Sequence, residues 1–87
     1  MIAAELPASL PTWQASARFG RVIRDLRESR RWSQEHLAGV ANLNRSYMGE
    51  IERSAAAPSL VTAEKLARAL GLSLSELILR CESEPDA

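Results

Sequence analysis

The fold of this 87-residue chain is decided by residues 34–53, which read QEHLAGVANLNRSYMGEIER. Two short helices that cross at a wide angle need a small residue where the second presses on the first, and Ala38 fits that place. The turn between them needs a residue that tolerates the left-handed conformation, and Asn42 stands there instead of the more usual Gly. The angle would be filled by Leu37, Ala41, Leu43, Met48 and Ile51. The stretch therefore predicts a helix-turn-helix.

The outer face of the second predicted helix is polar or small. It consists of Arg45, Ser46, Gly49 and Glu50. Such a face fits closely into the major groove of DNA, which is about 12 Å wide. In helix-turn-helix proteins the second helix reads base edges in that groove, while the first helix crosses the phosphate backbone.

Three more helices are predicted around this pair. The first runs from about Thr12 or Ser16 to Arg30, with apolar residues at Phe19, Val22, Ile23 and Leu26. Ser33 and Asn44 offer side-chain oxygens that can cap the two helices of the pair. Residues 58–71 predict a fourth helix, and Ser73-Leu74-Ser75-Glu76 is a capping box that starts a fifth. No segment alternates with period two, so we expect an all-α protein.

The chain is long enough for one small domain. We place the domain at residues 16–81, between an N-terminal tail at residues 1–15 and an acidic C-terminal tail at residues 82–87. No apolar run approaches the ~20 residues of a membrane span, and the first residues lack the pattern of a secretory signal. We therefore expect a cytoplasmic protein with no membrane association.

The charges cancel overall but not locally. Eleven Lys and Arg residues balance eleven Asp and Glu residues, yet residues 18–53 hold eight arginines against five acidic residues. This excess is either the solvated face of amphipathic helices or a basic surface that faces phosphates. The single Cys81 excludes a disulfide framework and a cysteine-rich zinc site, and the single His36 argues against a metal cage or a Ser-His-Asp site. We expect no enzyme, no cofactor and no metal, with Cys81 inert and His36 on the surface.

Several separated motifs agree in order and spacing with one family. They are Trp32 to Ala38, Asn44 to Arg53, Pro58-Ser59-Leu60 and Leu66 to Leu77. Together they resemble the Cro/repressor-type helix-turn-helix transcriptional regulators, also called the XRE family, over roughly residues 18–80. The resemblance implies a compact five-helix, lambda-repressor-like DNA-binding domain. The sequence of residues 45–53 looks most like that of the controller proteins of restriction–modification systems. Small phage repressors are equally compatible on length.

The resemblance implies phosphate contacts at three positions. Gln34 matches a position that contacts a phosphate and supports the recognition helix, and Asn44 matches a phosphate contact at the start of that helix. Arg53 matches a loop position close to the DNA backbone. Tyr47 either donates its hydroxyl to a phosphate or packs against the protein. The loop at residues 54–57 lacks the Gly and basic residues usual in the family, which makes dimerisation more necessary for affinity.

Base contacts and one ion pair are implied in the same way. Arg45, Ser46 and Glu50 match positions that face base edges, where Arg45 suits guanine and Glu50 suits the amino group of cytosine. An acidic side chain near phosphates is repelled unless it meets a hydrogen-bond donor. For Glu50, contact with a base and exposure to solvent without a base contact are therefore both open. Arg27 and Glu52 match a buried ion pair between the first and third helices. Trp32 is expected to plug the space between the first and second helices.

The last predicted helix carries more apolar surface than one small core covers. Its apolar residues are Leu74, Leu77, Ile78 and Leu79, and Leu79 points away from the others at about 100° per residue. We expect a homodimer through this helix, with Leu72 contributing and Trp13 anchoring either the tail or the dimer. Such a dimer would place two recognition helices about 34 Å apart on a near-palindromic operator.

The sequence therefore predicts a sequence-specific transcriptional regulator that binds double-stranded DNA as a homodimer. The alternative, from another class, is a protein-interaction module such as the antitoxin partner of a toxin. Its protein contacts would be the acidic tail and the stretch near Trp13.

Overall fold

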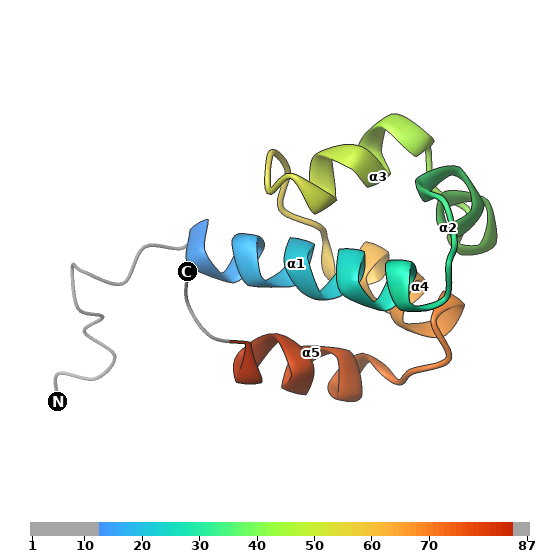
Figure 1. Ribbon diagram of the computed structural model, residues 1–87. Coiled ribbons are helices and arrows are strands. Elements are labelled where there is room, and N and C mark those ends of the chain that lie inside the picture. Colours follow the sequence, from blue (N-terminus) through green and yellow to red (C-terminus); the bar gives the residue numbers. More distant parts are fainter. Residues whose placement is uncertain (1–12, 85–87) are drawn as a thin grey trace, which may run out of the picture.

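The computed structural model describes residues 13–84, which form five helices and no strand (Figure 1). The helices are α1 (Trp13–Ser29), α2 (Gln34–Ala41), α3 (Arg45–Glu52), α4 (Leu60–Ala69) and α5 (Leu74–Ser83). Helix α1 lies between α3 and α5 and contacts both, while α2 packs against α3 and α4. The predicted all-α, five-helix fold is confirmed. The expected roles of residues 1–12, of the Trp13 side chain and of residues 85–87 lie outside the described residues.

The helices begin where the sequence offers a capping oxygen. Asn44 Oδ1 accepts hydrogen bonds from the backbone N–H of Ser46 at 2.8 Å and of Tyr47 at 3.3 Å. At the start of α5 the Ser73 hydroxyl accepts from the Glu76 N–H at 3.1 Å, and the Glu76 carboxylate accepts from the Ser73 N–H at 2.8 Å. The hydrogen bond from the Ser73 backbone N–H to the Glu76 carboxylate, with a further contribution from the Ser73 hydroxyl, lowers the pKa of Glu76. The capping box is confirmed.

The turn between α2 and α3 has the predicted geometry. Asn42 lies in the left-handed region at φ 58° and ψ 50°, and its backbone N–H donates to the carbonyl groups of Ala38 and Gly39. These bonds satisfy carbonyls at the end of α2 that would otherwise lack a partner. The turn sets α3 at a wide angle to α2 (Figure 1).

The core fills the space enclosed by all five helices. Its fully buried large side chains are Ile23, Leu37, Met48, Ile51, Leu66, Leu70 and Leu77. Leu77 was expected on the dimer face, and this expectation is wrong, because its side chain is 0% exposed within the protomer. A side chain with no accessible surface has nothing to offer a second copy. Leu77 therefore stabilises the protomer itself.

Helix α1 approaches the end of α3 at backbone distance. A Cβ atom on Gly20 would lie 2.7 Å from the carbonyl oxygen of Ile51 and 2.9 Å from that of Glu52. Only glycine permits this approach without moving one of the helices. Nothing local in the sequence marks Gly20 for this contact, because its partners are 31 and 32 positions away.

Candidate nucleic-acid interface

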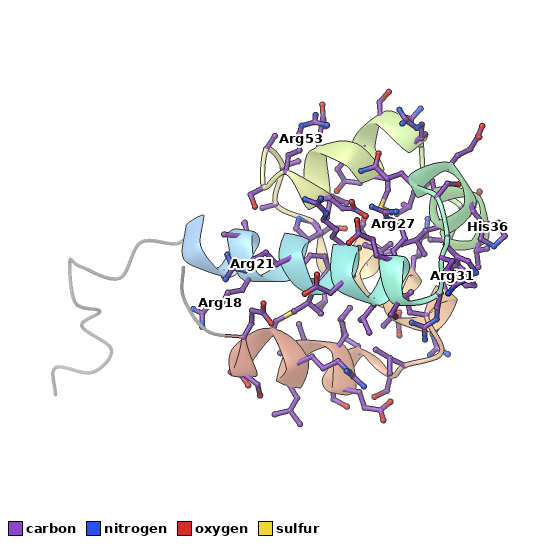
Figure 2. All side chains as sticks on the ribbon, in the orientation of Figure 1. Arg18, Arg21, Arg27, Arg31, His36 and Arg53 are labelled. Atoms are coloured by element: carbon purple, nitrogen blue, oxygen red, sulfur yellow. The ribbon has the colours of Figure 1, made fainter. Side chains whose placement is uncertain are left out.

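A bidentate ion pair fixes the end of α3 against α1. Arg27 Nε donates to Glu52 Oε2 at 2.7 Å, and Arg27 Nη2 donates to Glu52 Oε1 at 3.0 Å. The side chains are 12% and 3% exposed. Figure 2 shows Arg27 in the space between the two helices. The predicted buried ion pair between these residues is present.

Two further hydrogen bonds extend this pair to α2. Gln34 Nε2 donates to Glu52 Oε1 at 2.9 Å, and Arg27 Nη1 donates to the backbone carbonyl of Trp32 at 2.8 Å. The hydrogen bond with Glu52 raises the pKa of Arg27, against an opposing effect of burial. A single network thus holds α1, the start of α2 and the end of α3 in one fixed arrangement.

The first turns of α3 present an exposed polar face. Arg45, Ser46 and Glu50 all lie on the surface, and neither Arg45 nor Glu50 forms an ion pair with another described residue. Asn44 is exposed as well, and its capping oxygen is already engaged, which leaves its amide N–H groups for an external acceptor. The structure thus brings the residues expected to face bases together on the exposed side of one helix.

Gly49 departs from its expected place on the outer face. The structure buries it, because the Arg53 guanidinium and the Gln34 amide lie over it. Arg53 is itself exposed near the end of α3 (Figure 2). Gln34 and Arg53, which are expected to approach phosphates, are therefore neighbours on the surface.

The remaining aromatic residues lie between surface and core. Tyr47 is half-buried and packs against the core, which is the packing role expected as one of its two alternatives. Trp32 also packs on the core, as expected, and its ring meets the exposed His36 ring edge-on at a centroid distance of 4.7 Å. Cys81 is buried, and burial raises the pKa of its thiol to about 11.

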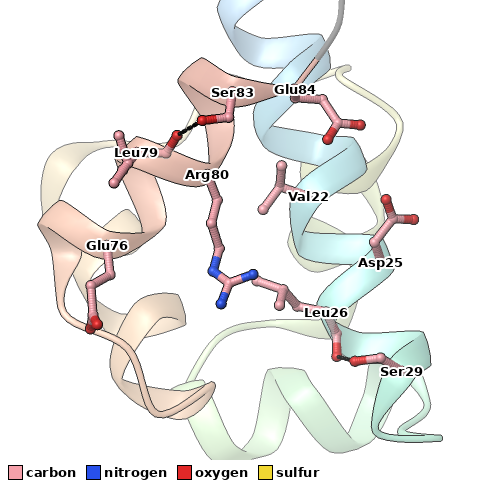
Figure 3. A pocket seen from close by; sticks show the side chains of 9 residues that line it. All are labelled: Val22, Asp25, Leu26, Ser29, Glu76, Leu79, Arg80, Ser83 and Glu84. Carbon is pink, nitrogen blue, oxygen red and sulfur yellow. Dashed lines mark hydrogen bonds between the residues drawn. The ribbon is translucent and has the colours of Figure 1, made fainter.

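Helix α5 leaves two apolar side chains on the surface. Ile78 is 38% exposed and Leu79 is 62% exposed, whereas Leu72 and Leu74 are half-buried against the core. Leu79 borders a groove between α1 and α5, across which Arg80 reaches toward Leu26 (Figure 3). Of the residues expected at a dimer contact, Ile78 and Leu79 thus offer most of the accessible surface.

Residues 13–84 contain no cluster of His, Cys, Asp and Glu side chains able to hold a metal ion. No helix in this part of the chain is long and apolar enough to cross a membrane.

This arrangement of five helices, with a capped and exposed third helix braced by a buried ion pair, defines the helix-turn-helix class of regulatory proteins. Residues 18–77 match the helix-turn-helix domain family, and the chain belongs to that family. Family membership confirms the predicted class, a transcriptional regulator of helix-turn-helix type rather than an enzyme.

The relatives include repressors and control proteins. The chain is 40% identical over 68 residues to the control protein C.MunI from Mycoplasma, a match that covers 77% of this chain and 92% of that protein. It is 44% identical over 59 residues to the immunity repressor of Bacillus phage phi105, covering 68% of this chain. The chain spans 41% of the length of that phage repressor.

Solved structures show the same fold. The restriction–modification controller protein C.AhdI from Aeromonas hydrophila superimposes with a TM-score of 0.68 at 44% identity, over 71% of this chain and 94% of that one. The hypothetical transcription factor NHTF from Neisseria superimposes with a TM-score of 0.70 at 38% identity, over 84% of this chain and 85% of that one.

Proposed function

We propose that this protein is a sequence-specific transcriptional regulator that binds a near-palindromic DNA operator as a homodimer through the major groove. The observation that carries the proposal is the exposed polar side of α3, which the buried Arg27–Glu52 pair holds in a fixed orientation. A reading helix must be fixed, because recognition of base edges depends on donor and acceptor geometry.

Three exposed residues of α3 make the direct base contacts. Arg45 can pair with O6 and N7 of a guanine, and Glu50 can accept from N4 of a cytosine. Ser46 can donate to or accept from either kind of base. These three side chains are exposed on one side of the helix, so they can enter the groove together.

Phosphate contacts surround this side of the helix. Asn44 offers amide N–H groups at the start of α3, Gln34 keeps one N–H beyond the bond to Glu52, and Arg53 offers its guanidinium. The Tyr47 hydroxyl adds a further donor. Such contacts set the register of the protein on the duplex, while the base contacts give specificity.

The homodimer forms through α5, around the exposed Leu79 and Ile78, with the edges of Leu72 and Leu74. A two-fold axis there gives two recognition helices that read two half-sites about one helical turn apart. Leu79→Glu is expected to convert the dimer to a monomer in sedimentation velocity, whereas Val40→Glu, at an equally apolar exposed site on α2, is expected to leave it dimeric. A wild-type monomer at tens of micromolar, or dissociation of both variants, refutes this interface.

The reading role of α3 is tested with two arginine variants. Arg45→Ala is expected to weaken binding to the operator selected from random DNA by about 1–3 kcal/mol and to relax specificity at one base pair. Arg24→Ala removes the same charge from the outer face of α1, where Arg24 pairs with Glu28, and is expected to change affinity little. Equal losses in the two variants would reduce the role of Arg45 to general electrostatic attraction.

A further inference from the structure

Gly49 lies near the middle of α3 and is covered by the Arg53 guanidinium and the Gln34 amide. Arg45 precedes it by four residues and Arg53 follows it by four, so the three share one face of the helix. A Cβ atom on Gly49 would lie 3.0 Å from Nη1 of Arg53 and 3.7 Å from Oε1 of Gln34. The Arg53 side chain therefore folds back along the helix and rests where a side chain at position 49 would stand.

The Arg53 guanidinium can take this position because residue 49 is a glycine and has no side chain. Ordinary contacts between heavy atoms lie at about 3.5–4.0 Å, so a methyl group at position 49 overlaps with Arg53 Nη1. Nη1 is the end of a flexible side chain, which can swing away at little cost. An alanine at this position therefore pushes the Arg53 guanidinium away by at least a few tenths of an ångström and leaves the helix intact.

The place that Arg53 occupies is suited to an anionic ligand. Its guanidinium has no carboxylate partner among residues 13–84. The neighbouring Gln34 amide turns its oxygen toward Gly49, while its Nε2 is held by the bond to Glu52 and retains one N–H for another acceptor. A rigid amide and a guanidinium side by side provide several donors for the oxygens of one phosphate group.

We propose that Gly49 is a positioning residue, which lets the Arg53 guanidinium lie on α3 beside Gln34 so that both donate to the same DNA phosphate. The proposal rests on the proposed function, because it concerns how the recognition helix is seated on DNA. It assigns Gly49 a role in binding that its lack of a side chain would not otherwise suggest.

The test is a double-mutant cycle with Gly49→Ala and Arg53→Ala. Binding to the selected operator is measured by fluorescence anisotropy over a series of salt concentrations. Gly49→Ala is expected to weaken binding about 3- to 10-fold. It should also lower the salt slope by as much as Arg53→Ala does, which is about 0.9 per half-site. In the Arg53→Ala background, Gly49→Ala should have no further effect, because the group that it displaces is already gone.

A matched control and a stability measurement separate positioning from folding. Gly39 lies in α2 with open space around it, so Gly39→Ala should leave affinity within about twofold. Alanine forms helix better than glycine, and the melting temperature of Gly49→Ala should equal or exceed that of the wild type. A loss of binding without a loss of stability is the result that the proposal requires.

Two outcomes overturn the proposal when the wild type binds its operator. One is a wild-type affinity and salt slope in Gly49→Ala. The other is an equal loss in the presence and absence of Arg53, which would mean that the methyl group collides with DNA directly. NMR relaxation of the Arg53 Nε–H without DNA adds an independent check, since Gly49→Ala should mobilise this group to the level of the exposed Arg24. A wild type that selects no operator refutes the proposed function instead, and the NMR result then decides the placement of Arg53 alone.

Discussion

Two glycine-to-alanine substitutions in neighbouring helices should change stability in opposite directions. Gly20 of α1 faces the backbone of α3, where a Cβ atom would lie 2.7 Å from one carbonyl oxygen and 2.9 Å from the next. Gly39 of α2 has no atom within 4 Å of the corresponding position. Both substitutions restrict the unfolded chain similarly, so the difference between them isolates the contact between α1 and α3.

The magnitudes follow from the geometry. An ordinary contact requires about 3.4 Å or more, so Gly20→Ala must separate α1 from α3 by roughly 0.5–0.7 Å. Overpacking of this kind costs about 1–3 kcal/mol, and here rigid backbone on both sides favours the upper end. The better helix propensity of alanine returns up to about 1 kcal/mol, which leaves a net loss of about 2 kcal/mol. Gly39→Ala has only the gain and should stabilise the protein by about 0.5–1 kcal/mol.

Thermal and urea unfolding followed by circular dichroism measure both effects. Gly20→Ala should lower the melting temperature by roughly 8–16 °C, and Gly39→Ala should raise it by roughly 2–8 °C. The urea m-values should stay at the wild-type value, because neither change alters the surface exposed on unfolding. Shifts of the same sign in both variants would refute the close backbone contact between α1 and α3.

Three further predictions concern single side chains. Arg27→Met leaves the nearly buried Glu52 carboxylate with one hydrogen bond, from Gln34, and should destabilise the protein to urea by about 3–5 kcal/mol; a loss below about 1 kcal/mol contradicts the structural role of the pair. The lowered pKa of Glu76 means that its contribution to stability is present above the ordinary value of 4.5 and is lost as the pH falls through the folded value. The difference in melting temperature between wild type and Glu76→Gln should therefore shrink from pH 7 to pH 3, and a constant difference would exclude the ionised cap. The raised pKa of Cys81, about 11 against an ordinary 9.0, should slow its alkylation at pH 8 about 100-fold relative to the urea-unfolded chain; equal rates would show that the thiol is open to solvent.

The helices and their order could be predicted because their signals are local. Asn44 and Ser73 cap within three residues of their own position, and Asn42 adopts the left-handed conformation that its side chain tolerates. Such choices depend on neighbouring residues and not on the rest of the fold. The Arg27–Glu52 pair joins residues far apart in the sequence, and the resemblance to a known family was needed to find it.

The features that the sequence did not reveal depend on distances between elements. Gly20 meets the backbone of α3, 31 and 32 residues further along the chain, and Gly49 meets the Arg53 guanidinium together with the amide of Gln34 in α2. Leu77 was placed on the dimer face because the apolar run at residues 77–79 covers a wide arc of α5. Which part of that arc faces the core depends on how α5 packs against α1.

Operator recognition is measured by selection from a pool of random DNA with the purified wild-type protein at two salt concentrations. One symmetric motif whose half-sites lie about 10 base pairs apart should be enriched, with affinity that falls steeply as salt rises. Weak binding with no enriched motif at either salt concentration would contradict operator recognition, and α3 would then have no reading function.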